Sequence, residues 1–427
     1  MSDRYLVVGL ARSGVAACEA ILRMWPGAEV LAADSRADLD VGRLRALGVE
    51  PVLGGDVVPV EGLSALVKSP GVPSQTDQVE AARVAGVPIW GEVELAARML
   101  PNPIAGVTGT NGKTTTTHLL GAMLAAGGLP CEVAGNVGRP LTSLPGRVDP
   151  DAWIACELSS FQLEDIDTLR CRVAAVLNLT PDHLDRHGTV EEYVRCKLRI
   201  FENQQPGDVA VVNGDDPVLR AAELPGDGER VVVTRSDAAA IDWEHAGLRG
   251  DHNLENALVA AAAARAAGAT PDGIDRALRE FSPLPHRLET VANAGGVEYV
   301  NDSKATNPDA TIQALTAFPG GMHLILGGSL KGSDFSGLAS AVAAAPVERA
   351  YLIGEAADAI AAALDGAGVA FERAGTLDAA VHAAAAAARP GETVLLSPAC
   401  ASFDQFRDYE DRGETFRRLA REVAGAA

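Results

Sequence analysis

The chain has 427 residues, and at roughly 150 residues per domain this length predicts about three domains, each able to bury its own core. Apolar residues make up 47% of the chain and charged residues 22%, values typical of globular proteins, which excludes wholesale disorder. No run of 18 or more apolar residues occurs, and the first residues lack the basic and apolar regions of a secretion signal. We therefore expect a cytoplasmic protein without a membrane span.

The net charge is −21, because 57 Asp and Glu residues outnumber 36 Lys and Arg residues. Such an acidic chain is not expected to bind nucleic acid or anionic lipid, since both depend on neutralising phosphates with basic side chains. The six cysteines lie far apart and form no C-x-x-C pair. This spacing predicts reduced thiols and no zinc site.

Apolar strand-like runs alternate with Ala-rich and Leu-rich helical runs along most of the chain. The alternation is typical of parallel sheets covered by helices on both faces, so we predict an α/β fold. We expect three domains, at residues 1–92, 93–284 and 285–427, of which the first and last are Rossmann-like. The predicted strands are residues 5–8, 29–32, 65–68, 87–92, 104–107, 153–157, 174–178, 208–213, 297–300, 323–326, 350–353 and 393–396.

The first chemical signal in chain order is the turn Gly9-Leu10-Ala11-Arg12-Ser13-Gly14, which follows the first predicted strand. Asp34 lies at the end of the next strand, 20 residues after Gly14. The pattern is similar to a dinucleotide-binding fingerprint, although Ala11 replaces the middle glycine. It fits a nucleotide diphosphate, with backbone N–H groups on the phosphates and Asp34 near a ribose or base. A plain turn between a strand and a helix is the alternative.

The strongest signal is Gly106-Val107-Thr108-Gly109-Thr110-Asn111-Gly112-Lys113-Thr114, between a predicted strand and a helical stretch at 114–126. Such a loop points backbone N–H groups and a helix N-terminus at phosphates, with Lys113 as a point charge and the Thr114 hydroxyl for Mg²⁺. The spacing is unusual, because Val107 stands where the motif has its first glycine. We predict an ATP site in a central mononucleotide-binding P-loop domain with a mainly parallel sheet. A chance glycine-rich turn is the alternative.

Two further polar groups follow predicted strands of the central domain. Glu157 ends the apolar run 153–157 and is a candidate Mg²⁺ ligand, since a P-loop site needs a carboxylate from a neighbouring strand. The alternative is a carboxylate that only faces solvent at a strand end. His183 lies in the polar turn 178–185, which fits either a metal or phosphate rim or an ordinary turn that caps a helix.

Lys197 lies on the apolar face of a predicted helix at residues 190–202, together with Tyr193, Ile200 and Phe201. A buried ammonium is costly, which leaves three interpretations. The side chain reaches the surface, pairs with a carboxylate, or is a functional amine with a lowered pKa. A neutral amine is also able to take up CO₂ as a carbamate and so become an anionic metal ligand.

Three polar clusters follow predicted strands of the last domain, at residues 301–307, 327–332 and 397–404. Ligands of doubly wound sheets bind at the carboxyl ends of the strands, so the three clusters predict one pocket. Solvated surface loops are the alternative.

Five segments, in order along nearly the whole chain, resemble the Mur ligases. They are GVTGTNGKT at 106–114, ELSSFQLE at 157–164, PHR at 285–287, NDSKATN at 301–307 and SPACASFDQF at 397–406. The resemblance implies that ATP phosphorylates the L-alanine carboxylate of UDP-N-acetylmuramoyl-L-alanine, and that an amino acid then attacks the acyl phosphate to form an amide. The segments at 157–164 and 397–406 favour D-glutamate as that amino acid. The reaction is a step of cytoplasmic peptidoglycan precursor synthesis.

The resemblance also implies roles for individual residues. Lys113 would hold the β- and γ-phosphates, Thr114 and Glu157 one Mg²⁺, and His183 with a carbamylated Lys197 a second Mg²⁺. The implied ATP contacts are Gly109, Thr110, Asn111, Gly112, Lys113, Thr114, Thr115, Asn253, Asn256, Arg287, Asp302 and Lys304. The implied contacts of the UDP substrate are Arg12, Ser13, Gly14, Asp34, Arg36, Ser69, Gly71, Asn136 and Ser159. The implied contacts of D-glutamate are Thr306, Lys331, Ser402 and Tyr409.

The expected partners are therefore small molecules, namely UDP-N-acetylmuramoyl-L-alanine, D-glutamate and ATP, and the chain is expected to be a monomer. A sister ligase that adds a different amino acid is the nearest alternative. A nicotinamide-dependent dehydrogenase would leave the P-loop unexplained, and a regulatory P-loop ATPase would hydrolyse ATP without a second substrate. Each of these two remote alternatives ignores two of the three domains.

Overall fold

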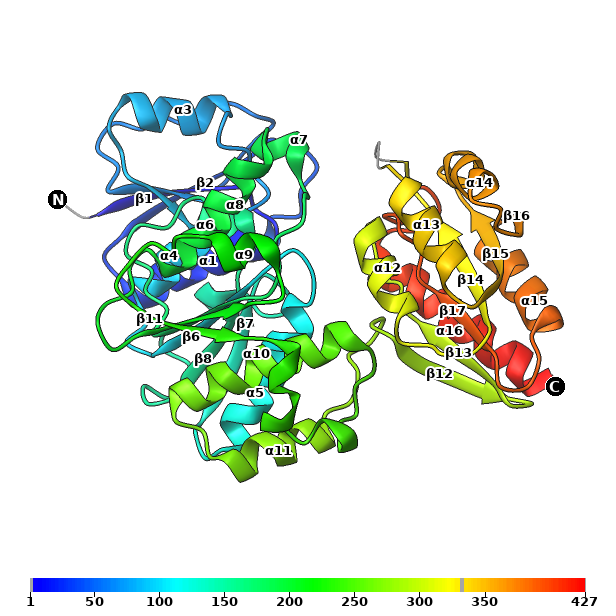
Figure 1. Ribbon diagram of the computed structural model, residues 1–427. Coiled ribbons are helices and arrows are strands. Elements are labelled where there is room, and N and C mark those ends of the chain that lie inside the picture. The colour runs from blue at the N-terminus through cyan, green and yellow to red at the C-terminus, as the bar shows by residue number, and fades with distance from the viewer. Residues whose placement is uncertain (1–2, 331–333, 427) are drawn as a thin grey trace. The chain divides into compact units, whose positions relative to one another are not determined.

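The computed structural model describes residues 3–330 and 334–426 and has an α/β fold built on three sheets (Figure 1). One sheet lies in each predicted domain, which confirms the predicted fold class. The chain forms two compact units. The first comprises Met1–Ala246 with Glu255–Glu280 and contains two sheets, and the second comprises Gly247–Leu254 with Phe281–Ala427. The domain boundaries near residues 92 and 284 fall between sheets and remain predictions.

The first sheet is parallel throughout, with strand order β3-β2-β1-β4-β5. Its strands are β1 (Arg4–Val8), β2 (Glu29–Asp34), β3 (Val52–Leu53), β4 (Ala65–Lys68) and β5 (Ile89–Gly91). Its helices are α1 (Arg12–Met24), α2 (Gly42–Ala46), α3 (Asp77–Val84) and α4 (Glu92–Ala97). Side chains alternate along β1, so Tyr5 and Val7 pack with α1 and α4 while Leu6 packs with α3.

The central sheet is also parallel, with strand order β11-β10-β9-β6-β8-β7. Its strands are β6 (Ile104–Thr108), β7 (Cys131–Gly135), β8 (Trp153–Glu157), β9 (Val173–Val176), β10 (Val209–Asn213) and β11 (Glu229–Val233). Because β6 lies between β8 and β9, the ends of these three strands meet at one edge. The P-loop, Glu157 and the turn at 178–185 all begin there.

The chain between and after these strands forms helices, of which α5 and α9 contact the central sheet directly. The α-helices are α5 (Lys113–Ala126), α6 (Ser160–Leu163), α7 (Leu184–His187), α8 (Val190–Leu198), α9 (Pro217–Ala221), α10 (Asp251–Ala267) and α11 (Pro271–Glu280). The 3-10 helices are η1 (Leu141–Ser143), η2 (Arg199–Phe201), η3 (Arg235–Ala240) and η4 (Trp243–His245). The sequence predicted one helix over 190–202, whereas the chain tightens from α8 into η2 after Leu198.

The third sheet has strand order β12-β13-β17-β14-β15-β16, with β12 antiparallel to β13 and the other pairs parallel. Its strands are β12 (Glu289–Ala294), β13 (Val297–Asn301), β14 (Met322–Gly327), β15 (Val347–Ile353), β16 (Phe371–Gly375) and β17 (Thr393–Leu396). Its helices are α12 (Pro308–Leu315), α13 (Ser336–Ala344), α14 (Ala357–Gly366), α15 (Leu377–Ala387) and α16 (Tyr409–Ala426).

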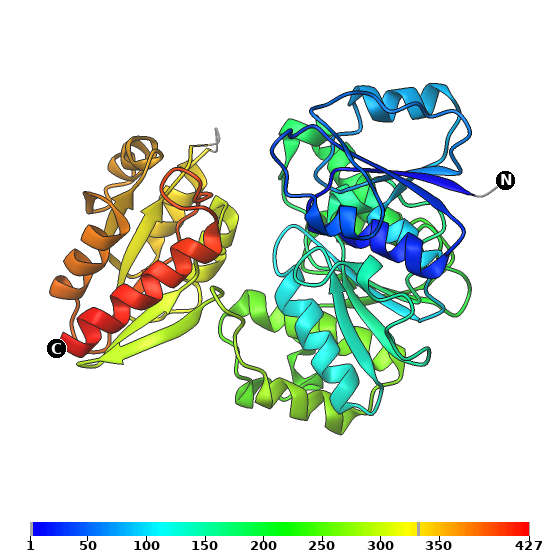
Figure 2. The same cartoon turned by 180° about the vertical axis from the view of Figure 1, so that it is seen from behind.

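Helices cover both faces of this third sheet, as the alternation of the strand side chains requires. Leu324 and Leu326 of β14 pack in one core with α13 and α14, whereas Ile325 between them packs in another with α15 and α16. Figure 2 shows α16 lying across the face that is turned away in Figure 1.

Two buried glutamates on α4 fix the junction between the first and central sheets. Glu92 Oε1 accepts hydrogen bonds from the amide and the hydroxyl of Thr142, at 2.7 and 2.6 Å. Glu94 accepts hydrogen bonds from the three consecutive amides of residues 167–169. Burial raises the pKa of Glu92. Buried carboxylates persist only when hydrogen-bonded, so these contacts set how α4 meets the central domain.

Each predicted strand overlaps an observed one. The strands that the sequence did not predict are β3, β7, β11, β12 and β16, and each lies at the edge of its sheet. The six cysteines are free thiols, in agreement with the prediction. Among the described residues, no helix has the length and apolar character needed to cross a membrane.

Candidate active site

The P-loop connects β6 to α5. Gly109 and Gly112 have φ angles of 155° and 82°, a region that favours glycine. Asn178, which follows β9, holds the loop from the neighbouring strand. The Asn178 carbonyl accepts a hydrogen bond from the Thr110 amide at 2.9 Å, and its Oδ1 accepts one from the Asn111 amide at 2.8 Å. The loop and the start of α5 together form an anion-binding site.

Lys113, the first residue of α5, folds over this loop. Its Nζ donates hydrogen bonds to the carbonyls of Gly109, at 3.0 Å, and Thr110, at 2.7 Å. On the other side, Gly112 packs against Asn256 of α10, because a Cβ built on Gly112 would lie 2.3 Å from Asn256 Oδ1. Two predicted ATP contacts from distant parts of the chain thus meet at the loop. Thr114 and Thr115 are buried in the first turn of α5.

Glu157 lies at the end of β8 and is 3% exposed, so it does not simply face solvent. Its Oε1 accepts a hydrogen bond from Asn136 Nδ2 at 3.0 Å, and its carbonyl accepts one from the Asn136 amide at 2.9 Å. The chain can approach this closely because residue 135 is glycine; a Cβ there would lie 2.1 Å from the Glu157 carbonyl oxygen. Glu157, which we predicted to bind Mg²⁺, thus contacts Asn136, which we predicted to bind the UDP substrate.

Lys197 is 2% exposed on α8. Its Nζ donates a hydrogen bond to the Gly109 carbonyl at 2.7 Å and lies 4.8 Å from the centre of the Tyr193 ring. Within the described parts of the chain, no carboxylate forms an ion pair with Lys197. Burial, with the nearby Lys113, lowers the pKa of Lys197 well below its usual value. Of the three interpretations, a side chain that reaches the surface and a side chain paired with a carboxylate are both wrong.

His183 stands at the N-terminal end of α7 with a φ of 52°, so it is also the turn residue of the alternative interpretation. Its ring lies 4.8 Å from the Phe161 ring, and its Nε2 is 3.6 Å from Asp182 Oδ2. The negative charges of Asp182 and Glu157 both oppose the lowering of the Lys197 pKa, so both carboxylates lie near Lys197. The predicted metal ligands of the central domain therefore lie in one neighbourhood.

The sequence did not single out His187 as part of this neighbourhood. Its ring stacks on Phe161 at 5.4 Å and meets Tyr193 edge-on at 5.5 Å, and its Nε2 lies 2.9 Å from Ser160 Oγ. Burial lowers the pKa of His187, which favours a neutral imidazole. The signal in the sequence was the spacing of four residues from His183, which puts both rings on one side of a helical turn.

The turn after β1 brings together several predicted contacts of the UDP substrate. A Cβ on Gly14 would lie 1.9 Å from the Gly9 carbonyl oxygen, so only glycine fits there. Ser69 Oγ donates a hydrogen bond to the same carbonyl at 2.6 Å, and Ser13 Oγ lies 3.3 Å from Ser69 Oγ. Arg12 Nη1 donates to the Gly138 carbonyl at 3.2 Å.

Asp34 completes this turn. Its Oδ2 accepts a hydrogen bond from the Leu10 amide at 2.7 Å, and its carboxylate pairs with Arg36 at 3.2 Å. Burial alone would raise the pKa of Asp34, but the hydrogen bonds from Arg36 and Leu10 lower it overall. Gly71 is exposed. Ser159 caps α6, accepting a hydrogen bond from the Gln162 amide at 3.2 Å.

In the second unit, predicted contacts lie at the carboxyl ends of β13 and β17. Asp302 accepts a hydrogen bond from Ser397 Oγ at 2.8 Å, and burial raises the pKa of Asp302 to about 7. Lys304 Nζ lies 3.7 Å from the centre of the Tyr409 ring. Ser402 is buried, whereas Thr306 and Arg287 are partly exposed. Asn253 Nδ2 donates a hydrogen bond to the Arg249 carbonyl at 2.8 Å. Lys331 lies outside the described residues.

Arg412 was not predicted, although it holds the strand ends of this unit together. The side chain is fully buried and donates hydrogen bonds to the carbonyls of Ser303, at 2.8 Å, and Cys400, at 3.0 Å. Its Nε donates to Ser303 Oγ at 3.0 Å. Nothing in the local sequence marked it, because an arginine in a helix that opens with charged residues usually faces solvent.

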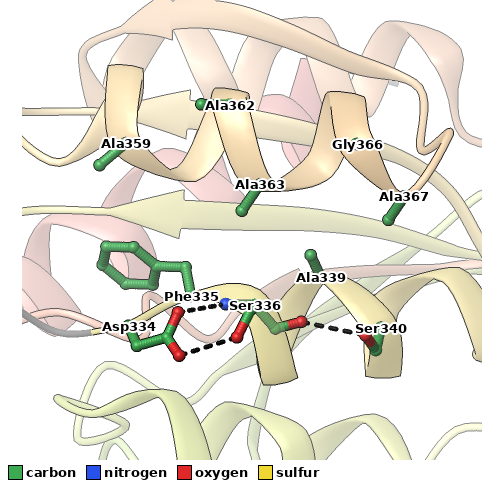
Figure 3. Close-up of a pocket in the computed structure, with 10 residues that line it drawn as sticks. All are labelled: Asp334, Phe335, Ser336, Ala339, Ser340, Ala359, Ala362, Ala363, Gly366 and Ala367. Carbon is green, nitrogen blue, oxygen red and sulfur yellow. Dashed lines mark hydrogen bonds between the residues drawn. The ribbon is translucent and has the colours of Figure 1, made fainter.

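A cavity of about 560 Å³ lies between α13 and α14 in the second unit (Figure 3). Alanines of both helices form much of its wall, and Asp334 and Ser336 at one end hydrogen-bond to each other. None of the predicted site residues lines it.

The fold and the P-loop agree with matches to known families. Residues 107–246 match the Mur ligase middle domain, and residues 286–400 match the family described as Mur ligase, glutamate ligase domain. Solved structures share the fold at low identity. The UDP-N-acetylmuramate-alanine ligase of Thermotoga maritima is 17% identical with a TM-score of 0.59, covering 100% of both chains. These matches define the class of protein as the Mur ligases.

More similar relatives narrow the class. The UDP-N-acetylmuramoylalanine--D-glutamate ligase of Acidobacterium capsulatum is 43% identical over 99% of this chain and 97% of its own length. Those of Myxococcus xanthus and Anaeromyxobacter dehalogenans are 45% and 46% identical, over 98% and 99% of this chain and 98% of their own lengths. The chain belongs to the family of UDP-N-acetylmuramoylalanine--D-glutamate ligases.

Proposed function

We propose that the chain joins D-glutamate to UDP-N-acetylmuramoyl-L-alanine at the expense of ATP, in the synthesis of peptidoglycan precursors. Family membership over nearly the full length supports this reaction. The observation that carries the mechanism is the convergence of two lysines. Lys113 and Lys197 both donate to the Gly109 carbonyl, one at the phosphate loop and one in a desolvated pocket beside it.

The reaction has two balanced steps. An oxygen of the L-alanine carboxylate attacks the γ-phosphorus of ATP, and ADP leaves. The amine of D-glutamate then attacks the acyl carbon, phosphate leaves, and the nitrogen loses a proton. In the first step Lys113 and the P-loop amides hold the β- and γ-phosphates. Hydrogen bonds from the charged Lys113 amine strengthen this binding.

The donor set at the P-loop suits Mg²⁺, a hard cation that prefers oxygen ligands. The Thr114 hydroxyl and the Glu157 carboxylate would hold one ion, and His183 with a modified Lys197 a second. Bound Mg²⁺ would neutralise charge between the carboxylate and the γ-phosphate. Among the described residues, no group of three or more His, Cys, Asp and Glu side chains is arranged to bind a metal. Each proposed ion therefore relies on Thr, Lys or substrate oxygens as further ligands.

The modification that we propose for Lys197 is a carbamate. The neutral amine attacks CO₂, a nitrogen–carbon bond forms, and the amine proton passes to water. Burial, with no ion-pair partner among the residues that the structure describes, favours the neutral amine that this step needs. The product is an anion with two oxygens in the place of a neutral amine.

The remaining predicted residues fall into three groups by ligand. The turn after β1, with Asp34, Arg36 and Ser69, would bind the UDP portion, and Asn136 and Ser159 the sugar and peptide. The nucleotide would contact the P-loop with Asn253, Asn256, Arg287, Asp302 and Lys304. D-Glutamate would contact Thr306, Lys331, Ser402 and Tyr409. We also propose that the enzyme is cytoplasmic and that it is a monomer. Sedimentation equilibrium would test the monomeric state.

The test is phosphate release from ATP with UDP-N-acetylmuramoyl-L-alanine and Mg²⁺, with D-glutamate, L-glutamate, L-alanine, glycine, L-lysine and diaminopimelate added separately. We expect release with D-glutamate only, and a product heavier by one glutamyl residue. Release with a different amino acid would make the chain a sister ligase. If no phosphate is released with any of these amino acids, the proposed function is contradicted.

A further inference from the structure

Arg186, on α7, holds three segments of the first unit together. Its Nη1 donates a hydrogen bond to the Pro70 carbonyl at 2.8 Å. Its Nη2 donates to the Val72 carbonyl and to Glu164 Oε2, both at 3.1 Å. Its guanidinium lies 4.2 Å from the centre of the Phe161 ring. The side chain is 14% exposed, so most of these contacts are shielded from water.

On one side, Arg186 supports the two histidines. Its guanidinium lies over the Phe161 ring, and the rings of His183 and His187 pack on that same ring at 4.8 and 5.4 Å. The Arg186 amide also donates to the His183 carbonyl at 3.1 Å. His183 has a positive φ, which a non-glycine residue keeps only where its surroundings hold it. The orientation of the His183 ring therefore depends on the layer formed by Phe161 and Arg186.

On the other side, Arg186 fixes the turn at residues 69–72, which carries Ser69 and Gly71. The turn closes through a hydrogen bond from the Val72 amide to the Ser69 carbonyl at 3.0 Å. The two carbonyls that Arg186 binds are on residues 70 and 72 of this turn. Under the proposed function, the same turn contacts the UDP substrate.

A buried set of charges behind the turn orients Glu164 toward Arg186. Lys68 Nζ lies 2.7 Å from Asp165 Oδ2 and donates a hydrogen bond to Ser74 Oγ at 2.6 Å. Ser74 Oγ in turn donates to Glu164 Oε1 at 2.6 Å. With Oε1 occupied, Oε2 of Glu164 receives Arg186. A partly desolvated network of charged and hydrogen-bonded groups restricts the movement of its members, so it holds Glu164 in the orientation that meets Arg186.

We propose that Arg186 is a positioning residue that couples the turn at residues 69–72 to the His183 imidazole. Binding of the UDP substrate at the turn would then fix the histidine for phosphoryl transfer. The inference rests on the proposed function, because that function assigns ligands to both ends. Two nitrogens of the planar guanidinium reach the two carbonyls and the carboxylate while its plane lies over the Phe161 ring, and the single nitrogen of a lysine cannot reproduce this arrangement.

The test compares Arg186→Lys with a matched control, Arg98→Lys. Arg98 also lies 4.2 Å from an aromatic ring centre, that of Trp90, and also bridges the first and central sheets, pairing with Glu94 at 2.8 Å and Asp167 at 2.6 Å. Both variants should lose thermal stability. Only Arg186→Lys should weaken binding of UDP-N-acetylmuramoyl-L-alanine, measured by calorimetry without ATP, and lower kcat, each by about tenfold. The KM for D-glutamate should not change.

A spectroscopic readout separates positioning from stability. With histidine labelled by ¹³C at Cε1, the ring signals of His183 and His187, assigned through His→Gln variants, should shift when the UDP substrate binds the wild-type protein. In Arg186→Lys they should already differ before the substrate is added, and the response to substrate should be lost. In Arg98→Lys both features should match the wild type.

The two proposals can fail separately. If the wild-type protein releases no phosphate in the presence of D-glutamate, the proposed function fails. The ligand-free histidine spectra of wild type and Arg186→Lys still decide the positioning role in that case. Unchanged ring signals in Arg186→Lys, or equal kinetic losses in both arginine variants, would overturn the coupling.

Discussion

Two lysines of the first unit are almost fully buried, and their surroundings differ. Lys68, 1% exposed at the end of β4, pairs with Asp165 at 2.7 Å and with Glu164 at 3.6 Å. Lys197, 2% exposed on α8, has a carbonyl and an aromatic ring as its contacts. Burial lowers the pKa of Lys197 well below its usual value. A buried lysine with carboxylate partners serves structure, whereas one without them is available for chemistry.

The largest expected effect is that of Lys197→Ala. Removing the amine removes the proposed metal-binding anion, so ligation should fall about a thousandfold or more. A short carboxylic acid added to the assay should restore part of the activity by filling the vacated pocket. The measurement is phosphate release with D-glutamate. Full activity of the unaided variant would place Lys197 in the same class as Lys68.

Lys113→Ala should follow closely, because it removes the point charge from the phosphates. We expect a loss of about a thousandfold in kcat, with no restoration by carboxylic acids, since an anion cannot replace this cation. The assay is the same. Rescue of both lysine variants by the same acid would contradict the distinction between the two amines.

Lys68→Met should act mainly on stability, with a much smaller effect on turnover than Lys197→Ala. The change leaves Asp165 and Glu164 without their buried cation, which costs about 3 kcal/mol in the free energy of unfolding. Urea denaturation measures this loss. The double variant Lys68→Met with Asp165→Asn should recover part of it. A Lys68→Met protein that stays folded but loses turnover as Lys197→Ala does would break the comparison.

The smallest expected effect is the pH dependence of the unfolding free energy that Asp302 causes. Asp302 has a pKa raised to about 7 by burial, so between pH 5 and 7 the folded chain holds a proton that the unfolded chain has released. Stability conferred by this group is therefore present at low pH and is lost as pH rises through 7. Relative to Asp302→Asn, the wild-type protein should lose about 2 kcal/mol of unfolding free energy between pH 5 and 7. A pH-independent difference would contradict the raised pKa.

The strands at the centre of each sheet were predictable because they are apolar on both faces. Residues 65–68 and 393–396 are buried throughout. The edge strands other than β5 were not predicted. Of these, β11 and β16 have mostly exposed or half-buried residues and so resemble polar loops in sequence. A sheet edge needs apolar residues on one face only, and in five residues that leaves too few to form a pattern.

Among the site residues, the P-loop was predictable because its chemistry lies in consecutive residues. Arg186 and Arg412 were not, because their partners come from segments that lie far away in the chain. The Pro70 carbonyl is 116 residues from Arg186, and the Ser303 carbonyl 109 residues from Arg412. Which buried arginine serves a site depends on tertiary contacts that no local window contains.

The contact between Gly112 and Asn256 has a consequence for drug resistance. Position 112 has a φ of 82°, and any side chain there would collide with an amide that is itself a proposed ATP contact. A bacterium under pressure from an inhibitor seated on this glycine could not escape by substituting it without disturbing its own nucleotide site. Compounds that bind close to the Gly112 backbone would therefore face a narrower range of escape mutations than compounds anchored on the exposed Gly71.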